Sequence, residues 1–113
     1  MTGLSSVYVT TANRAGALAI GRDLVGRRLV ACANLFDHVD SIFRWQGEIC
    51  EEGETVLIAK TRSALVPAVI ARIREIHEYD CPCIVAWPIE QGEPAYLDWV
   101  RAQTTPHGID TGH

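Results

Sequence analysis

The strongest constraint on the fold is a long strand-like stretch that ends in a two-residue turn. Apolar residues between positions 30 and 45 follow no helical period, and Gln46-Gly47 suits a tight hairpin because glycine tolerates a positive φ. The fourteen residues from Cys32 to Trp45 would reach ~46 Å at about 3.3 Å per residue. A compact chain of 113 residues is only about 34 Å across. The hairpin is therefore predicted to project beyond its own domain, with the pairs Trp45–Glu48, Arg44–Ile49 and Phe43–Cys50.

The residues around this hairpin alternate between strand and helix patterns. A β-branched and aromatic run predicts a strand over 7–10. Asn13 is a suitable N-cap for a helix over 14–29, whose apolar face would carry Leu18, Val25 and Leu29. After the acidic residues 51–54, a third strand is expected over 55–61.

The second half of the chain repeats this layout. Ser63 is a candidate N-cap and Pro67 suits a first helical turn, and apolar residues at positions 66, 69, 70, 73 and 76 predict an amphipathic helix. A buried strand is expected over 83–87, ended by Pro88, and Pro94 suits the start of a terminal helix. The order β-α-β-β-α-β plus a helix predicts an α+β, ferredoxin-like fold with an extended central hairpin.

Length and composition indicate one domain over residues 1–103, followed by a flexible tail over 104–113. Acidic residues outnumber basic ones by 14 to 10, which disfavours nucleic acid as a partner. No apolar run is long enough to cross a bilayer, and residues 1–6 lack the features of a signal peptide. A cytoplasmic location is expected, in which the four cysteines would be thiols or metal ligands.

The hairpin tip predicts self-association. Ile42, Phe43, Trp45 and Ile49 would be exposed on a projecting hairpin, and exposed apolar edge strands tend to pair with another chain. A homo-oligomer is therefore the favoured interpretation, and the alternative is a bent hairpin that folds back on its own sheet.

Several stretches resemble the CutA family, which is associated with divalent-cation tolerance. They lie at residues 31–34, 44–49, 57–61, 77–82, 87–92 and 96–99. The resemblance covers residues 6–103 and implies a ferredoxin-like subunit, a homotrimer assembled through the central hairpin, and a link to copper and other divalent cations. It implies no established reaction. Thr10 and Ile76 stand where some bacterial members have a cysteine and a second histidine that are proposed as copper ligands.

Two thiols and an imidazole form the candidate metal site. His77, Cys81 and Cys83 are close in sequence, and residues 81 and 83 would share one face of an extended strand. Thiolate and imidazole groups suit Cu(I) or Zn(II), with Cys32 or a neighbouring subunit as a fourth ligand. The alternative, which we favour, is that the cysteines pack as small apolar groups and His77 makes a local hydrogen bond.

Lys60, Tyr79 and Trp45 form a candidate ligand cleft between subunits. Lys60 ends a strand that reads as buried, so its ammonium group needs a carboxylate or a ligand. The cleft would hold a small anion. The alternative is an ion pair between Lys60 and Glu48 or Asp80.

Enzyme motifs are absent from the sequence. It contains no Gly-x-Ser-x-Gly, phosphate-binding glycine loop or His-Glu-x-x-His. Acylphosphatase, copper-chaperone and RNA-binding proteins share the predicted topology, but this chain lacks the residues that each needs. The sequence therefore predicts a non-enzymatic, trimeric protein of metal tolerance or signalling. The alternatives are a metal-independent regulator resembling the PII signalling proteins, which binds a small ligand, and a small hydrolase with its site between subunits.

Overall fold

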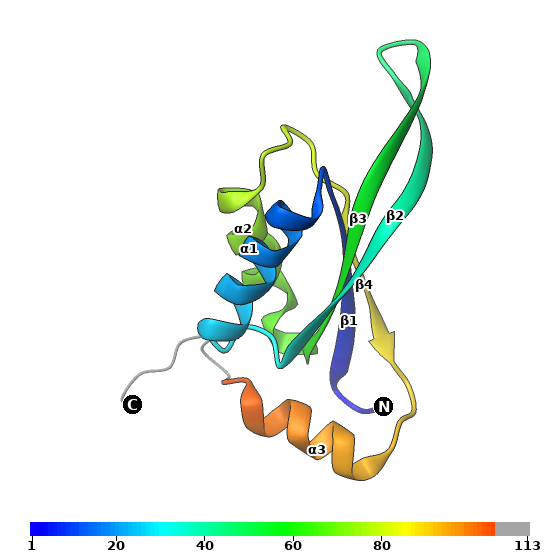
Figure 1. The fold of residues 1–113 in the computed structure, drawn as a ribbon. Helices are drawn as coiled ribbons and strands as arrows, with labels where there is room; N and C mark the ends of the chain where they lie inside the picture. The colour runs from blue at the N-terminus through cyan, green and yellow to red at the C-terminus, as the bar shows by residue number, and fades with distance from the viewer. Residues whose placement is uncertain (106–113) are drawn as a thin grey trace.

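The structure is a computed structural model that describes residues 1–105. Four antiparallel strands form one sheet with the order β2-β3-β1-β4 (Figure 1). The α+β, ferredoxin-like arrangement predicted from the sequence is confirmed. The strands are β1 (Leu4–Thr11), β2 (Cys32–Trp45), β3 (Glu48–Arg62) and β4 (Ile84–Ile89); the helices are α1 (Arg14–Gly26), α2 (Val66–Ile76) and α3 (Pro94–Gln103), with a 3₁₀ turn, η1 (Ser63–Leu65), before α2.

The main core lies between one face of the sheet and the two helices α1 and α2. Val7 and Val9 of β1 are fully buried there with Leu24 of α1 and Ile73 of α2. Because side chains alternate along a strand, the residues between them point to the opposite face. We call this opposite side the open face. It carries Ser6, Tyr8, Cys32, Asn34, Phe36, Ile58, Lys60, Val85 and Trp87.

Helix α3 covers one end of the open face. Its Leu97 and Val100 pack against Leu4 of β1, with Ile89 of β4 beside them. The predicted start at Pro94 is confirmed. Thr104, the first residue of the predicted tail, is buried and accepts a hydrogen bond from Arg62. Residues 106–113 of that tail lie outside the described residues.

Asn13 caps α1 as predicted, because its side chain accepts a hydrogen bond from the Gly16 amide at 2.8 Å. The predicted apolar face and length were wrong. The helix ends at Gly26, and its buried residues are Ala17, Ile20, Gly21 and Leu24. A Cβ added to Gly21 would lie 3.4 Å from side-chain atoms of both Ala33 and Leu57, so small residues let the helix approach the sheet.

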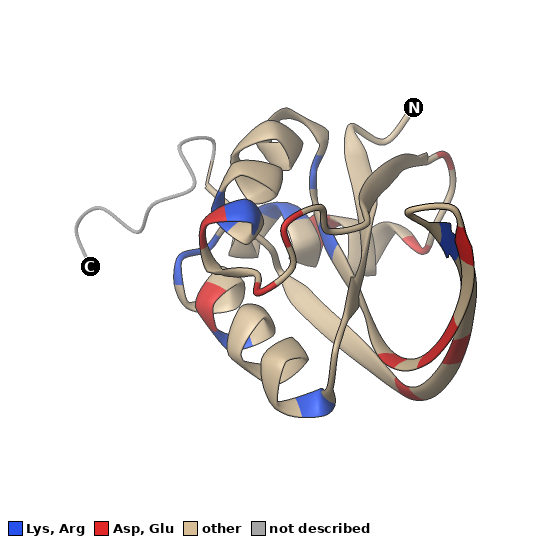
Figure 2. Cartoon of the chain, turned by 90° about the horizontal axis from the view of Figure 1, so that it is seen from above, with Lys and Arg blue, Asp and Glu red and all other residues tan. Residues whose placement is uncertain are grey.

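The central hairpin has the predicted register, with Trp45 opposite Glu48 and Phe43 opposite Cys50. Gln46 and Gly47 both have positive φ values, of 50° and 83°, as a type I′ turn requires. The predicted break at residues 51–54 is wrong, since β3 runs without interruption from Glu48 to Arg62. Glu51 and Glu52 are exposed there, whereas Glu54 is buried and accepts a hydrogen bond from Tyr79. Figure 2 shows acidic residues as red segments along both strands of the hairpin.

A β-bulge sets which side chains the outer hairpin turns toward the open face. Asp37 and His38 of β2 lie opposite the single residue Thr55 of β3. Such a bulge shifts the alternation by one residue. As a result, Phe43 and Trp45 share a face with Phe36, although their positions in the sequence are odd and that of Phe36 is even.

The start of α2 and the course of β4 differ from the prediction. Ser63 does not cap α2, which begins at Val66 after η1; its hydroxyl lies 2.7 Å from that of Ser5 instead. Pro88 lies inside β4 rather than ending it. It is tolerated because β4 is an edge strand, where a missing N–H costs no ladder hydrogen bond. Most of β4 is exposed in the single chain, whereas the sequence predicted a buried strand.

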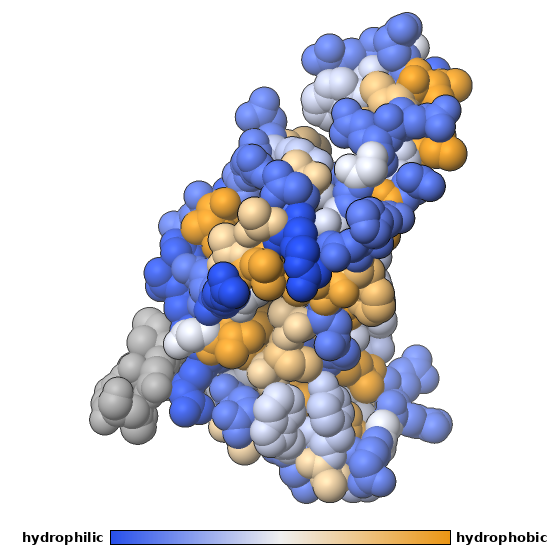
Figure 3. Space-filling model, in the orientation of Figure 1, coloured by the Kyte–Doolittle hydropathy of each residue, from blue (hydrophilic) through white to orange (hydrophobic). Residues whose placement is uncertain are grey.

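The hairpin projects well beyond the helices, so the alternative in which it folds back on its own sheet is wrong (Figure 1). The chain measures 45 × 30 × 21 Å. Trp45 at the tip is 50% exposed, and Ile42 and Ile49 are each 69% exposed. Figure 3 shows hydrophobic residues gathered at this tip. Among the described residues, no helix is both long and apolar enough to span a membrane.

Candidate functional site

His77, the predicted metal ligand, directly follows α2 and uses both ring nitrogens inside the protein. Nε2 lies 2.8 Å from the Thr10 carbonyl oxygen, and Nδ1 lies 3.0 Å from the Tyr79 amide nitrogen. Since Nδ1 accepts the amide hydrogen, the neutral ring carries its own proton on Nε2 and donates it to Thr10. His77 therefore makes the local hydrogen bonds of the favoured interpretation.

The two thiols of the predicted site lie in the loop before β4. Cys81 and Cys83 are both exposed, and neither belongs to the strand, which begins at Ile84. The assumption that both residues are part of an extended strand was therefore wrong. The Cys83 carbonyl accepts a hydrogen bond from the Thr10 amide at 3.3 Å. This bond places the end of the loop beside the end of β1.

Cys32, the predicted fourth ligand, lies at the start of β2 and contacts α3. Its sulfur is 3.2 Å from the hydroxyl oxygen of Tyr96. This contact, together with burial, raises the pKa of Tyr96 to about 12, so the phenol is neutral at pH 7. Sequence reasoning missed this contact because its two residues are 64 positions apart and no periodic pattern joins them.

Across residues 1–105, no three His, Cys, Asp or Glu side chains are grouped so that they could hold a metal ion. His77 has its nitrogens engaged, and Cys32 contacts Tyr96. The four predicted ligands thus do not fit a metal ion within one chain. A site completed by a second copy stays a prediction.

Tyr79 follows His77 and joins the loop to the hairpin. Its hydroxyl donates a hydrogen bond to Glu54 Oε2 at 2.8 Å. Burial, together with that carboxylate, raises the pKa of Tyr79 well above its usual value. Tyr79 therefore acts as a neutral donor that holds the loop against β3.

Lys60 lies in the inner strand β3, and its Nζ is 2.9 Å from Asn34 Oδ1. Within residues 1–105 of one chain, neither Glu48 nor Asp80 pairs with it, so the ion pair considered from the sequence stays a prediction that would need a second copy. Trp45 pairs with Glu48, which is twelve residues from Lys60 along β3, or ~40 Å at about 3.3 Å per residue. Within one chain, Trp45 and Lys60 cannot share a cleft, and their predicted site requires another copy.

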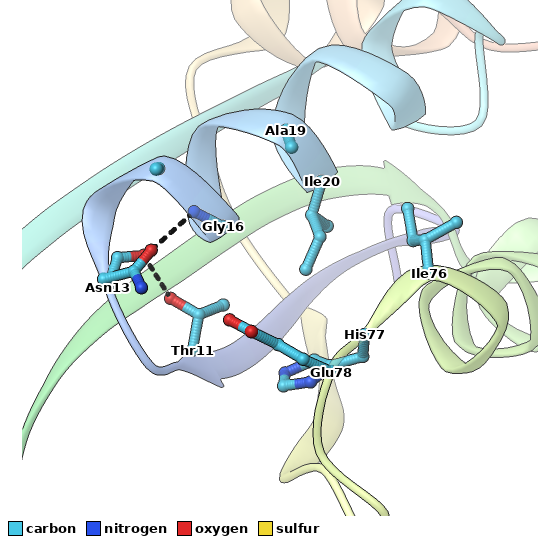
Figure 4. A pocket seen from close by; sticks show the side chains of 9 residues that line it. Thr11, Asn13, Gly16, Ala19, Ile20, Ile76, His77 and Glu78 are labelled. Atoms are coloured by element: carbon cyan, nitrogen blue, oxygen red, sulfur yellow. Dashed lines mark hydrogen bonds between the residues drawn. The ribbon is translucent and has the colours of Figure 1, made fainter.

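A hollow of about 420 Å³ lies beside the first turn of α1 and is lined by Thr11, Asn13, Gly16, His77 and Glu78 among others (Figure 4). A Cβ on Gly16 would lie only 3.3 Å from Glu78 Oε1. The carboxylate of Glu78 thus lies beside the first turn of α1, where the helix dipole is positive. We interpret the hollow as a structural contact between the loop and α1.

Comparison with known proteins decides the family. Residues 5–103 match the family described as CutA1 divalent ion tolerance protein. The chain belongs to this CutA1 family. The divalent-cation tolerance protein CutA of Thermus thermophilus is 41% identical over 98 residues, which are 87% of this chain and 95% of that protein. The crystal structure of CutA from Xylella fastidiosa has a TM-score of 0.89 at 32% identity and covers 91% of this chain and 99% of that one.

Animal CutA proteins are longer. Protein CutA of Mus musculus is 42% identical over 101 residues, which are 89% of this chain but only 57% of the mouse protein. The chain thus spans just over half the length of this relative. Membership of the CutA1 family confirms the resemblance found in the sequence, and the family is named for tolerance of divalent ions rather than for a reaction.

Proposed function

We propose that this CutA1 family member works as a homotrimer in the tolerance of divalent cations, without catalysing a reaction. The match of residues 5–103 to the divalent ion tolerance family supports this role. Copper is the first cation to test, because it is the cation that the sequence resemblance implies. The cytoplasmic location stays a prediction.

The exposed hairpin supports self-association. Leaving Trp45, Ile42 and Ile49 in water is unfavourable, and contact with a second copy would bury them. The sheet also ends in two unlike edges, β2 and β4, each with unpaired backbone groups. Pairing one edge with the other edge of the next copy is a head-to-tail contact, which closes into a ring when the rotation allows it. The sequence resemblance implies that three copies complete the ring.

Any metal site is expected to need more than one copy. Within the described chain, the predicted ligands are engaged or separated, so we derive no step that depends on a bound metal. Metal tolerance would then depend on the assembled protein rather than on the single subunit.

Two measurements test this proposal. Light scattering at micromolar concentration should give three times the mass of the chain, and a monomer would contradict it. Cells that lack their own CutA protein should grow better on copper when they carry this chain than when they carry an empty vector. Equal growth across copper, zinc and cobalt gradients would contradict the tolerance role.

A second candidate function is the binding of a small ligand without a metal. Lys60 supports it, because the only hydrogen-bond partner of its ammonium group among residues 1–105 is the neutral amide of Asn34. A half-buried cation with no carboxylate partner is suited to bind an anion.

A further inference from the structure

Two of the four cysteines lie close together in a loop. Residues 77–83 connect α2 to β4, belong to no helix or strand, and pass beside the end of β1 (Figure 1). Cys81 and Cys83 are both exposed in this loop and are separated only by Pro82, whereas Cys32 and Cys50 are partly buried. The loop therefore presents a pair of accessible thiols.

The backbone allows the two sulfur atoms of this pair to meet. Two residues span at most about 7 Å between Cα atoms, and a disulfide needs Cα atoms about 4.4–6.8 Å apart. A fully extended strand would hold Cys81 and Cys83 near the upper limit, but the chain bends at Cys81 and no strand ladder fixes it. The two thiols can thus bond without disrupting any helix or strand.

The other two cysteines are not suited to pair with each other. Cys32 lies opposite Lys60 at the inner end of the hairpin, and Cys50 lies opposite Phe43 near the tip. For Cys81 and Cys83, each is the nearest thiol to the other along the chain, and closing such a short loop costs less entropy than closing a long one. A disulfide within the loop is therefore the favoured product when the protein is oxidised.

We propose that Cys81 and Cys83 form a reversible disulfide, with a peroxide as the oxidant. One thiol loses its proton and attacks the O–O bond of hydrogen peroxide, which gives a sulfenic acid and one water. The second thiol then attacks the sulfenic sulfur, so that the S–S bond forms and a second water leaves. The two thiols lose two electrons and two protons, and one hydrogen peroxide becomes two waters.

Pro82 favours the reverse reaction. Its ring fixes φ near about −65° and biases the preceding residue toward extended backbone, whereas the disulfide needs the two Cα atoms drawn together. Strained or exposed disulfides are the readily reduced ones. A small dithiol should therefore reopen the bond, because its two thiols form their own disulfide and return two electrons and two protons to Cys81 and Cys83.

Closing the disulfide should move the end of the loop rather than its beginning. The beginning is held by His77, whose ring contacts the Thr10 carbonyl and the Tyr79 amide, and by the bond from Tyr79 to Glu54 at 2.8 Å. At the end of the loop, the Thr10 amide donates to the Cys83 carbonyl over a longer distance of 3.3 Å. This longer bond is the one that we expect oxidation to weaken.

Trypsin separates the cysteines so that the disulfide can be detected directly. Residues 75–101 form one peptide that contains Cys81 and Cys83, while Cys32 and Cys50 fall in the peptides 29–44 and 45–60. The full chain is treated with dilute hydrogen peroxide in EDTA, its remaining thiols are alkylated, and the peptides are analysed by mass spectrometry. The peptide 75–101 should be unalkylated and two hydrogens lighter, and dithiothreitol should restore both alkylation sites.

Two results of this experiment would overturn the proposal. In one, the peptide 75–101 stays doubly alkylated or carries only sulfinic and sulfonic acids, so that no disulfide has formed. In the other, the oxidised chain runs as a covalent dimer on a non-reducing gel, which would join cysteines of separate copies.

Cys83→Ser and Cys50→Ser form a matched pair of variants. Cys83→Ser leaves the sulfenic acid of Cys81 without a thiol to attack it, so labelling of the peptide 75–101 by dimedone should be about tenfold higher than in the wild type. Cys50→Ser should form the disulfide at the wild-type rate. Reduced Cys83→Ser should melt at the wild-type temperature, because the thiol that it replaces is exposed. Equal dimedone labelling of Cys83→Ser and the wild type would contradict the two-thiol mechanism.

Amide hydrogen exchange tests the movement of the loop. The Thr10 amide should exchange several-fold faster in the oxidised wild type than in the reduced protein, and the same peroxide treatment of Cys83→Ser should leave its rate unchanged. Equal rates in the oxidised and reduced wild type would overturn the predicted movement. These measurements are made in EDTA and leave the metal-tolerance proposal untouched, because light scattering and growth on copper test it separately.

Discussion

His77 ties the loop after α2 to the end of β1 through the carbonyl oxygen of Thr10, 2.8 Å from Nε2. The ring also accepts the amide hydrogen of Tyr79, so a single side chain satisfies two backbone groups from different parts of the chain. A residue that the sequence marks as a metal ligand therefore serves as a structural clamp in the single subunit.

His77→Ala should destabilise the chain by about 1–3 kcal/mol, because the substitution leaves the Thr10 carbonyl and the Tyr79 amide without their partner. Urea unfolding measures the change. His38→Asn is the control, since His38 lies on the hairpin at a φ of 60° that asparagine tolerates, and its stability should hardly change. If zinc or Cu(I) shifted the His77 ring signals in an NMR titration before any others, the ring would be a ligand after all.

Trp45→Asp should weaken self-association. An apolar ring that is half-exposed in one chain would be replaced by a carboxylate, which an interface can bury only at a cost of several kcal/mol unless it finds a partner. Sedimentation should show smaller particles at micromolar concentration, with an unchanged circular dichroism spectrum. Glu51→Gln should assemble normally, because it removes a charge from the same hairpin and introduces no new one. An unaltered assembly in Trp45→Asp would place the contact elsewhere.

Asp23→Asn should lower stability at neutral pH by about 1 kcal/mol. The Asp23 carboxylate on α1 accepts two hydrogen bonds from Arg72 on α2, at 2.9 and 2.7 Å, and these bonds lower the pKa of Asp23. A lowered pKa means that the stabilisation is complete above the unfolded value of about 3.9 and is lost as the pH falls through the folded value.

Urea unfolding of the wild type and Asp23→Asn at pH 7 and at pH 3 checks whether the stabilisation by Asp23 is lost in acid. The difference between the two proteins should shrink in acid. Asp98→Asn is the control, because Asp98 is 79% exposed in its pair with Arg101 and should change stability by less than about 0.5 kcal/mol at either pH. A difference that is equal at both pH values would show that the Asp23 charge is not what stabilises the helix pair.

Gly47→Ala should loosen the hairpin tip. Gly47 has a φ of 83°, where an alanine is strained by about 1 kcal/mol. Amide hydrogen exchange near Trp45 and Glu48 should become faster. Gly53→Ala provides a matched control on the same hairpin, because Gly53 has no positive φ and a Cβ there meets nothing within 4 Å. Slower exchange in Gly47→Ala than in Gly53→Ala would contradict the assigned turn.

Local patterns were sufficient to predict the order of elements and the hairpin register. The pair Gln46-Gly47 fixes the turn, and a two-residue loop leaves only one way to align Phe43 with Cys50. The buried face of α1 could not be predicted in the same way. It runs through Ala17 and Gly21, whose burial depends on how closely the helix approaches the sheet rather than on their hydrophobicity.

The candidate sites depend on contacts between distant residues and were therefore harder to predict. Lys60 was recognised from its place in an apolar strand, but its partner Asn34 follows only from the strand order and register. The hydrogen bonds of His77 were anticipated only as an alternative to metal binding, because a sequence does not show which backbone groups lie near a ring.

The bulge at Asp37 and His38 bears on the size of any particle that the chain builds. Deleting one of these residues would turn Phe43 and Trp45 to the opposite face while leaving the turn and β3 intact. If copies join through unlike edges, the direction in which each hairpin leaves its sheet sets the rotation between neighbours. A ring forms only when that rotation divides a full circle, and any other value continues into an open fibre. The one extra residue in β2 would then determine whether the copies form a closed ring or an open polymer.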